Sequence, residues 1–368
     1  MITPLLPYAG SVTSVDLSRT VLRAVRRAVD DGVLRVAVPE RVVVTVPGAG
    51  GWGDYATNVA LQLARPAGQP PLRVAELLRP RLVGLDGIDD VVVTGPGFLN
   101  MRLRDSVSAD LVADVLRHGS RYGFAPSGAP GGSDGSSQVL LCPGDVRSVV
   151  VTDVVARLLR AQGAVVRARC PDGAPGGAWT DALRVDAALF RDDVPAGKSG
   201  PEHPVRVRRC SGDPLVLGRD AGRWALLHPA PQDRVRLGGE HLVQRESNPL
   251  FRVRYAHARA RAVLRGGSDL GLRPLPGDTG AADAELLALL ADHPRVLRRA
   301  ADTRAPDRLT RHLVAVADAS LPLLADVLPR GDEKPSAAHR ARLALAEAAG
   351  AVLAGGLSLL GIDAPDHL

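Results

Sequence analysis

The chain has 368 residues, of which 45% are hydrophobic and 23% are charged, a balance that fits a globular protein of two or three domains. Its net charge of +6 comes almost entirely from arginine, because Lys198 and Lys334 are the only lysines. Guanidinium groups suit phosphate ligands, although codon bias toward arginine gives the same composition. Cys142, Cys170 and Cys210 form no C-x-x-C pair, which argues against a zinc ribbon or a disulfide framework.

No targeting segment is recognisable in the sequence. Residues 1–4 lack the basic stretch and the apolar run that open a signal peptide. No uninterrupted apolar run is expected to be long enough to span a bilayer. Sparse, widely spaced cysteines suit a reducing compartment, so we expect a cytoplasmic protein without membrane contact.

Residues 1–120 are expected to form a small α+β domain. Apolar residues at helical spacing predict helices over residues 15–33, 55–63, 74–82 and 109–118. Short runs rich in β-branched and apolar residues predict strands over residues 41–46, 90–94 and 98–103. Residues 121–137 are expected to be a flexible linker, because most of them are Gly, Ser, Pro and Ala.

Residues 138–240 predict a small, reduced α/β domain. A helix is expected over residues 149–161, between strands over 139–142 and 164–169. Farther along the chain Gly and Pro are frequent, and we predict only short strands over residues 205–208 and 224–227.

Residues 241–368 predict an all-α domain. Helical periodicity predicts four helices, over residues 249–265, 281–301, 307–328 and 337–360. Their short connections are typical of an antiparallel bundle. The predicted fold class is therefore a multi-domain protein with α+β and all-α parts.

Two glycine-rich stretches resemble phosphate-binding motifs. Residues 48–53 fit G-x-G-x-x-G after a strand, but no second strand ending in an acid follows as a dinucleotide fold requires. Residues 197–199 match the end of a phosphate loop, but Asp192 stands where its first glycine belongs. The histidines do not cluster and no H-E-x-x-H is present, so we expect neither a cofactor nor a metal.

Five short stretches are more specific: GDYATNVAL at 53–61, GPGFLN at 95–100, SNPLF at 247–251, YAHAR at 255–259 and LGIDAP at 360–365. The first two resemble segments of the N-terminal domain of arginyl-tRNA synthetases. The others resemble the start and the end of the helical anticodon-binding domain of that family. The resemblance implies that the first domain contacts the elbow of tRNA and that the helical domain holds the anticodon stem-loop.

The DALR motif of that family has two candidate positions. Residues 181–184 spell it literally, whereas residues 220–223 read DAGR. The second stretch precedes Tyr255 by the spacing that the family shows, and an aromatic and apolar run follows it. We therefore interpret residues 220–223 as the counterpart and the literal copy as chance.

The catalytic motifs of the family are missing. The HIGH motif, which holds ATP phosphates, would lie at residues 142–147, where the sequence reads CPGDVR. Asp145 adds a negative charge there, and residues 211–214 replace the KMSK-like loop. The middle segment is also less than half as long as a synthetase catalytic domain. The resemblance therefore implies a non-catalytic relative, because phosphoryl chemistry depends on positioned charges.

The resemblance also implies candidate RNA-binding residues. On the first domain these are Tyr55, Asn58, Phe98 and Asn100. On the helical domain they are Asn248, Arg252, Arg254, Tyr255, His257, Arg259, Arg308 and Arg311. The helix over 249–265 holds five arginines and no acid, so we expect no neighbouring acid to neutralise it. The alternatives are a solvated arginine face, a core position for Phe98 and a packing role for His257.

The favoured interpretation is a tRNA-binding protein that does not activate an amino acid, with an arginine-family tRNA as partner. A protein-interaction module, for example a partner of a synthetase, is the first alternative. An enzyme of new activity in the middle segment is the second, which the irregular Gly- and Pro-rich sequence disfavours.

Overall fold

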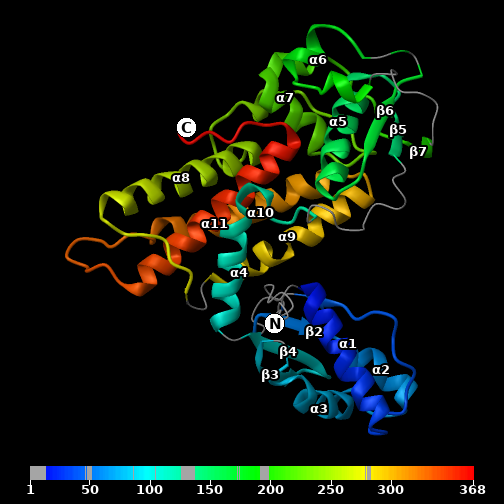
Figure 1. Ribbon diagram of the computed structural model, residues 1–368, viewed down its shortest axis with the longest axis vertical. Coiled ribbons are helices and arrows are strands. Elements are labelled where there is room, and N and C mark those ends of the chain that lie inside the picture. Colours follow the sequence, from blue (N-terminus) through cyan, green and yellow to red (C-terminus); the bar gives the residue numbers. More distant parts are fainter. Residues whose placement is uncertain are drawn as a thin grey trace, which may run out of the picture. The chain divides into compact units, whose positions relative to one another are not determined.

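A computed structural model describes residues 14–45, 47, 52–85, 87–103, 105–125, 137–171, 173, 175–190, 199–277, 279 and 283–368. The chain forms two compact units (Figure 1). The first unit holds Met1–Arg117, Leu272–Asp292 and Pro329–Leu345. The second unit holds His118–Gly271, His293–Leu328 and Ala346–Leu368. Most of both glycine-rich motifs and of the expected linker lies outside the described residues.

The first unit contains an antiparallel sheet whose strand order is β1-β2-β4-β3. Its strands are β1 (Val44–Thr45), β2 (Tyr55–Thr57), β3 (Ile88–Thr94) and β4 (Phe98–Leu103). The helices of this region are α1 (Ser14–Asp30), α2 (Val59–Ala67), α3 (Pro71–Leu82) and α4 (Asp105–His118). Leu17 of α1, Leu78 of α3 and Leu99 of β4 belong to one buried core, which confirms an α+β domain.

The GDY stretch ties this sheet together. The backbone N–H of Asp54 donates to the carbonyl of Met101 at 2.9 Å, and the Asp54 carboxylate accepts from the N–H of Leu103 at 2.7 Å. Gly53 has a φ of +85°, and a Cβ there would lie 2.7 Å from the Met101 oxygen. Glycine is therefore required at position 53 to let the chain approach β4.

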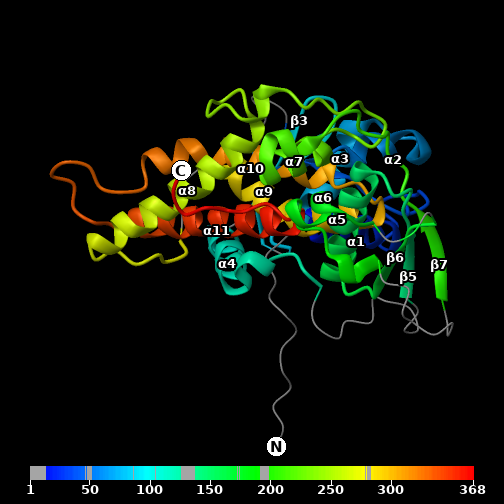
Figure 2. The ribbon, with the colours of Figure 1, turned by 90° about the horizontal axis from the view of Figure 1, so that it is seen from above.

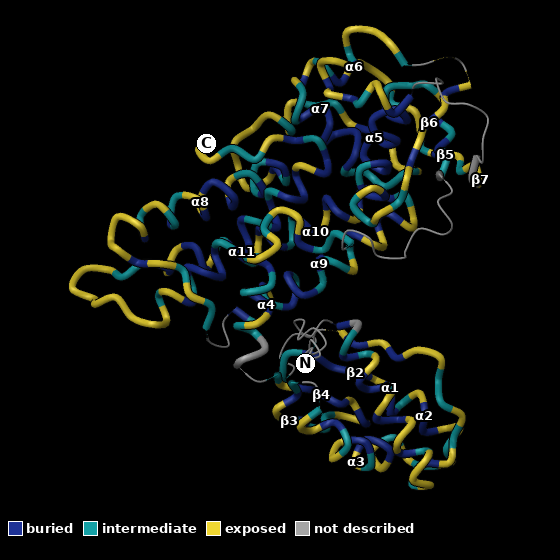
Figure 3. The backbone as a smooth tube through the Cα atoms, viewed as in Figure 1, coloured by how far each residue is buried: buried dark blue, intermediate teal, exposed yellow. Residues whose placement is uncertain are grey.

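A small parallel sheet of order β6-β5-β7 opens the second unit. Its elements are β5 (Ser137–Leu141), α5 (Val146–Ala161), β6 (Val166–Arg169) and β7 (Ser199–Pro204). This part of the chain also contains α6 (Ala178–Ala182), α7 (Gly218–Leu227) and 3-10 turns at Gly119–Arg121, Ala187–Phe190, Pro214–Leu217 and Gly239–His241. Helix α5 is buried along most of its length (Figure 3), and the polar Ser148, Thr152 and Asp153 are buried together with its apolar residues.

Four long helices follow: α8 (Pro249–Asp269), α9 (Ala284–Asp302), α10 (Asp307–Ala325) and α11 (Ala337–Leu360). Helix α8 packs along α10. Gly350 of α11 lies against Ala260 of α8, where a Cβ would meet it at 3.2 Å (Figure 2). These contacts confirm the predicted helical region.

Three sequence predictions of local structure are wrong. Tyr55–Thr57 is a strand paired with β4, and the helix starts only at Val59. Trp224–Leu227 lies in α7, because a run buried on all sides loses the periodicity that separates helix from strand. Residues 205–208 follow the strand β7 instead of forming one.

One described helix is apolar enough to be compared with a membrane span, although Glu347 interrupts its apolar run. Helix α11 contains an 18-residue window long and apolar enough to cross a membrane, with a mean hydropathy of 1.8. Because 78% of that window is buried inside the protein, its apolar side chains are already covered. A helix that is apolar all round is typical of a protein core as well as of a membrane span.

Arg223 of α7 is fully buried and links three parts of the second unit. Its guanidinium donates to the Asp153 carboxylate at 2.7 Å, to the Leu360 carbonyl at 2.7 Å and to the Leu183 carbonyl at 2.5 Å. Burial lowers the pKa of Arg223, and the nearby Asp153 carboxylate opposes that shift. Gly361, with a φ of +70°, leaves the space that this guanidinium occupies.

We predict that Arg223→Ala lowers the free energy of unfolding by about 3–5 kcal/mol, because it removes one of the two arginine partners of the buried Asp153 carboxylate and the donor to the Leu183 and Leu360 carbonyls. Urea denaturation followed by tryptophan fluorescence measures the change. Arg167→Ala, at an exposed position of β6, is the control and should change stability little. A loss below about 1 kcal/mol for Arg223→Ala would contradict the linking role.

Candidate nucleic-acid interface

Asn248 shapes the start of α8 from a buried position. Its side-chain oxygen accepts from the N–H of Leu250 at 3.1 Å, which caps the helix. Its amide nitrogen donates to the carbonyls of His241 and Val243 at 2.9 and 3.0 Å. With all of these groups occupied, Asn248 holds the preceding loop and has no free group for a ligand.

An exposed line of side chains runs along α8. Phe251, Tyr255 and Arg259 are each four residues apart and so share one side of the helix. The two rings stack with centroids 5.5 Å apart and planes 18° apart, and Tyr255 is 39% exposed. Arg259 is exposed and has no ion-pair partner among the described residues. We call these three residues the α8 line.

Three of the other four arginines of α8 are paired with acids, contrary to the expectation that no neighbouring acid neutralises them, and Arg265 donates to the backbone carbonyl of Asp366 at 3.3 Å. Arg252 donates to both oxygens of Asp318 of α10, at 2.9 and 2.8 Å. Arg254 lies 3.9 Å from Asp220, and Arg261 lies 3.0 Å from Asp366. These acids lie outside α8: Asp220 is in α7, Asp318 is in α10, and Asp366 is in the segment that follows α11. The helix is therefore less positive than its own sequence predicts.

His257 is a packing residue of α8. It is 4% exposed, and its Nδ1 lies 3.0 Å from the carbonyl oxygen of Pro365, to which a protonated Nδ1 donates. Burial lowers the pKa of His257, while the hydrogen bond to Pro365 opposes that shift. The side chain thus fastens the C-terminal segment to the helix.

The two candidate arginines of α10 differ in their partners. Arg311 pairs with Asp307 at 2.5 Å, one helical turn away. Arg308 is exposed and its Nε donates to the Thr303 hydroxyl at 3.2 Å. Both remain accessible to an anionic ligand, because the Arg311 side chain is 55% exposed.

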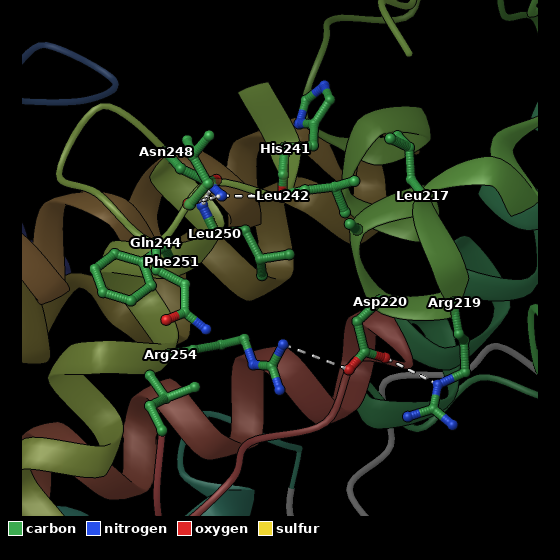
Figure 4. A pocket seen from close by; sticks show the side chains of 13 residues that line it. Leu217, Arg219, Asp220, His241, Leu242, Gln244, Asn248, Leu250, Phe251 and Arg254 are labelled. Atoms are coloured by element: carbon green, nitrogen blue, oxygen red, sulfur yellow. Dashed lines mark hydrogen bonds and ion pairs between the residues drawn. The ribbon is translucent and has the colours of Figure 1, made fainter. Parts of the chain in front are cut away.

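A cavity of about 310 Å³ lies between the start of α8 and α7 (Figure 4). Asp220 stands on its wall between two arginines, 2.9 Å from Arg219 and 3.9 Å from Arg254. Phe251 lines the cavity and also belongs to the α8 line. Asp220, from the DAGR stretch, therefore offsets positive charge of the arginines on the cavity wall. Arg223 of the same stretch is buried and pairs with Asp153 in the core.

In the first unit, the candidate residues divide between core and surface. Tyr55 is 5% exposed, and Asn100 is 3% exposed and donates to the Thr94 hydroxyl at 2.6 Å. Phe98 is 40% exposed, so it does not fill the core. The register that pairs Thr57 with Leu99 places the exposed Asn58 beside Phe98 at the same end of the sheet.

An acid lies where the sequence resemblance leads us to expect the HIGH motif. Asp145 caps α5: one carboxylate oxygen accepts from the N–H of Ser148 at 3.3 Å and the other from its hydroxyl at 2.5 Å. The N-terminus of such a helix is where phosphate groups bind in nucleotide-binding folds. The carboxylate of Asp145 therefore fills that place with a negative charge.

Arg147, two residues after Asp145, is also buried at the start of α5. No sequence motif marks it as important. Its guanidinium donates to the carbonyls of Leu226, Arg208, Asp233, Pro229, Ala230 and Pro231, at 3.1, 2.9, 2.8, 3.1, 2.9 and 3.4 Å. Burial lowers the pKa of Arg147, and the nearby Cys210, Asp233 and Asp145 oppose that shift. The loops that follow β7 and α7 are thereby held over the carboxyl end of the parallel sheet, where open α/β sheets bind ligands.

Within the part of the chain that the structure describes, no group of three or more His, Cys, Asp or Glu side chains could hold a metal ion. The literal DALR stretch lies near the surface, where Arg184 pairs with Asp363 at 2.9 Å. The site thus offers arginine and aromatic side chains as its ligand-facing groups.

The N-terminal and C-terminal parts of the chain each match a known protein family. Residues 17–103 match the family described as arginyl tRNA synthetase N terminal domain, and residues 253–368 match the DALR anticodon binding domain. An arginine–tRNA ligase of Frankia alni is 26% identical over 553 aligned positions, covering 97% of this chain and 100% of that protein. One of Renibacterium salmoninarum is 26% identical over 554 positions, with coverage of 97% and 100%.

Solved structures share the fold. The arginyl-tRNA synthetase of Thermus thermophilus matches with a TM-score of 0.69 and 15% identity, covering 96% of this chain and 99% of that one. The enzyme of Plasmodium falciparum matches with a TM-score of 0.70 and 8% identity, covering 98% and 99%. At these identities the likeness concerns the fold alone.

The fold and its helical region define a synthetase-type protein with an anticodon-binding domain. More particularly, the chain is related to the arginyl-tRNA synthetases and carries their N-terminal and DALR domains. Its 368 residues align over 553 positions, so it lacks a long stretch that these relatives contain.

The buried His257 predicts a pH dependence of stability. Because its pKa is lowered in the folded state, the unfolded chain, with a pKa of about 6.5, binds the proton more tightly. The free energy of unfolding should therefore fall as the pH drops below about 6.5. His257→Gln should reduce that slope in denaturation curves taken between pH 7.5 and pH 5, relative to wild type. His367→Gln, at an exposed position, is the control; equal slopes for wild type and His257→Gln would refute the prediction.

Proposed function

We propose that this chain binds tRNA through its DALR domain and does not activate arginine. The observation that carries the proposed loss of activation is the start of α5, where Asp145 caps the helix and Arg147 binds backbone carbonyls at the position expected for the HIGH motif. We further propose that the partner is an arginine-family tRNA and that the protein acts in the cytoplasm.

Loss of activation follows from electrostatics. Adenylation needs positive or dipolar groups aimed at the phosphates of ATP. The Asp145 carboxylate would repel them, and it already accepts the helix N–H at 3.3 Å that a phosphate would use. The guanidinium of Arg147 is turned to backbone carbonyls and so cannot serve a phosphate instead.

The α8 line supports RNA binding. An exposed aromatic side chain can stack on an unpaired base, a contact worth about 1–3 kcal/mol. Tyr255 is already stacked on Phe251, which orders the ring before a base arrives. Arg259, one turn further, can contact a phosphate on the same side of the helix.

A second candidate function is a protein-interaction module in which RNA binding has decayed. The acids that neutralise Arg252, Arg254 and Arg261 favour it, because they weaken the positive potential along α8. Binding of tRNA distinguishes the two functions directly.

We predict no arginine-dependent exchange between pyrophosphate and ATP. The reason is the carboxylate at the start of α5, which disfavours bound phosphates. The exchange assay is run beside an active arginyl-tRNA synthetase at the same substrate concentrations. Exchange above background in the purified chain would show that activation survives.

We predict that the double variant Tyr255→Ala/Arg259→Glu binds tRNA at least about tenfold more weakly, since loss of about 1.4 kcal/mol gives that factor. Filter binding at moderate salt measures the affinity, and circular dichroism confirms the fold. Arg65→Glu, at an exposed position of the first unit, is the control. A double variant that folds and binds tRNA like wild type would disprove the role of the α8 line, and a wild type that binds no tRNA favours the interaction module.

A further inference from the structure

Two segments of the second unit lie side by side beyond the carboxyl end of β7. The N–H of Arg208 donates to the carbonyl of Pro231 at 2.7 Å. The guanidinium of Arg147 then holds the carbonyls of Arg208 and Asp233, at 2.9 and 2.8 Å. Residues 205–209 and 231–236 are thus fixed to each other and to the start of α5.

Both segments bury a valine and expose arginines. Val205 and Val235 are buried, at 4% and 8% exposure, and Val207 is half-buried. The arginines between and beside them are exposed, and they are Arg206, Arg208, Arg209, Arg234 and Arg236. We call these five residues the arginine face.

Only one arginine of the arginine face, Arg209, has an ion-pair partner among the described residues. Arg209 lies 4.0 Å from Asp145 and is 77% exposed. Among the described residues, the other four arginines of the face have no ion-pair partner, unlike Arg252 and Arg261 of α8. The only acid in either segment is Asp233, whose carbonyl, held by Arg147, fixes the backbone in place.

We propose that the arginine face binds the phosphodiester backbone of RNA, as a second contact separate from the α8 line. This inference rests on the proposed function, because the ligand is taken to be the same tRNA. Guanidinium groups bind phosphate oxygens in pairs, and a row of them neutralises successive phosphates. The face belongs to the same compact unit as α8 and α10, so one RNA can engage both.

The backbone of the face is ordered before a ligand arrives. Six hydrogen bonds from one buried guanidinium hold the two segments and α7, so little backbone freedom is lost on binding. The segments that Arg147 holds thereby present their exposed arginines from a fixed backbone.

The test compares tRNA binding by two variants of equal charge change. The face variant is Arg206→Glu/Arg208→Glu/Arg234→Glu, and the control is Arg167→Glu/Arg298→Glu/Arg299→Glu, which changes exposed arginines of β6 and α9. We expect the face variant to bind at least about tenfold more weakly than the control and to show a smaller salt slope. On duplex DNA each neutralised phosphate contributes about −0.9 to that slope.

A second face variant, with glutamine at the same three positions, keeps the test valid if charge reversal disturbs folding. This glutamine variant should also bind tRNA more weakly than the control, by a smaller factor than the glutamate variant. Wild-type affinity and salt slope in both face variants, or equal weakening in the control, would overturn the inference while the proposed function stands. Loss of binding to phosphatidylserine vesicles with tRNA affinity unchanged would also overturn it. A wild type that binds no tRNA would remove the proposed function itself.

Discussion

The second unit depends on the burial of two guanidinium groups. A buried arginine is stable only where its N–H groups find acceptors, and Arg147 and Arg223 find them mostly in backbone carbonyls. Those carbonyls belong to loops and helix ends and include those of the buried Leu183, Leu226 and Leu360. The two arginines therefore join α5 to α7 and to the end of α11.

The same arrangement connects structure to function. Arg147 and Asp145 occupy the carboxyl end of the parallel sheet, where open α/β sheets bind ligands. The helical domain keeps an exposed aromatic and arginine line on α8. The acids that pair with neighbouring arginines limit the positive potential there, which makes geometry more important than net charge for recognising an RNA.

Sequence patterns predicted most of the helices and the motifs that led to the family, because both depend on local spacing. They failed for Trp224, whose run is buried on every side, and for Tyr55, where a short strand precedes a helix. Arg147 was missed because its partners are carbonyls 61 to 86 residues away, which leave no side-chain signal. The pairing of Arg252 with Asp318 was missed for a related reason, since the acid comes from another helix. Asn100 and Phe98 belong to the same motif, yet Asn100 is buried and Phe98 is exposed. The motif alone does not reveal that difference.

The central claim is that the chain kept RNA-binding surfaces while its nucleotide crevice was closed. Sequencing the RNA that crosslinks to the protein in its own cells tests that claim most directly. The account predicts strong enrichment of full-length tRNA over other RNA, with crosslinks in the protein at Tyr255 and close to Arg208. Recovery of no RNA above that of an untagged control, or of a protein partner alone, would contradict it.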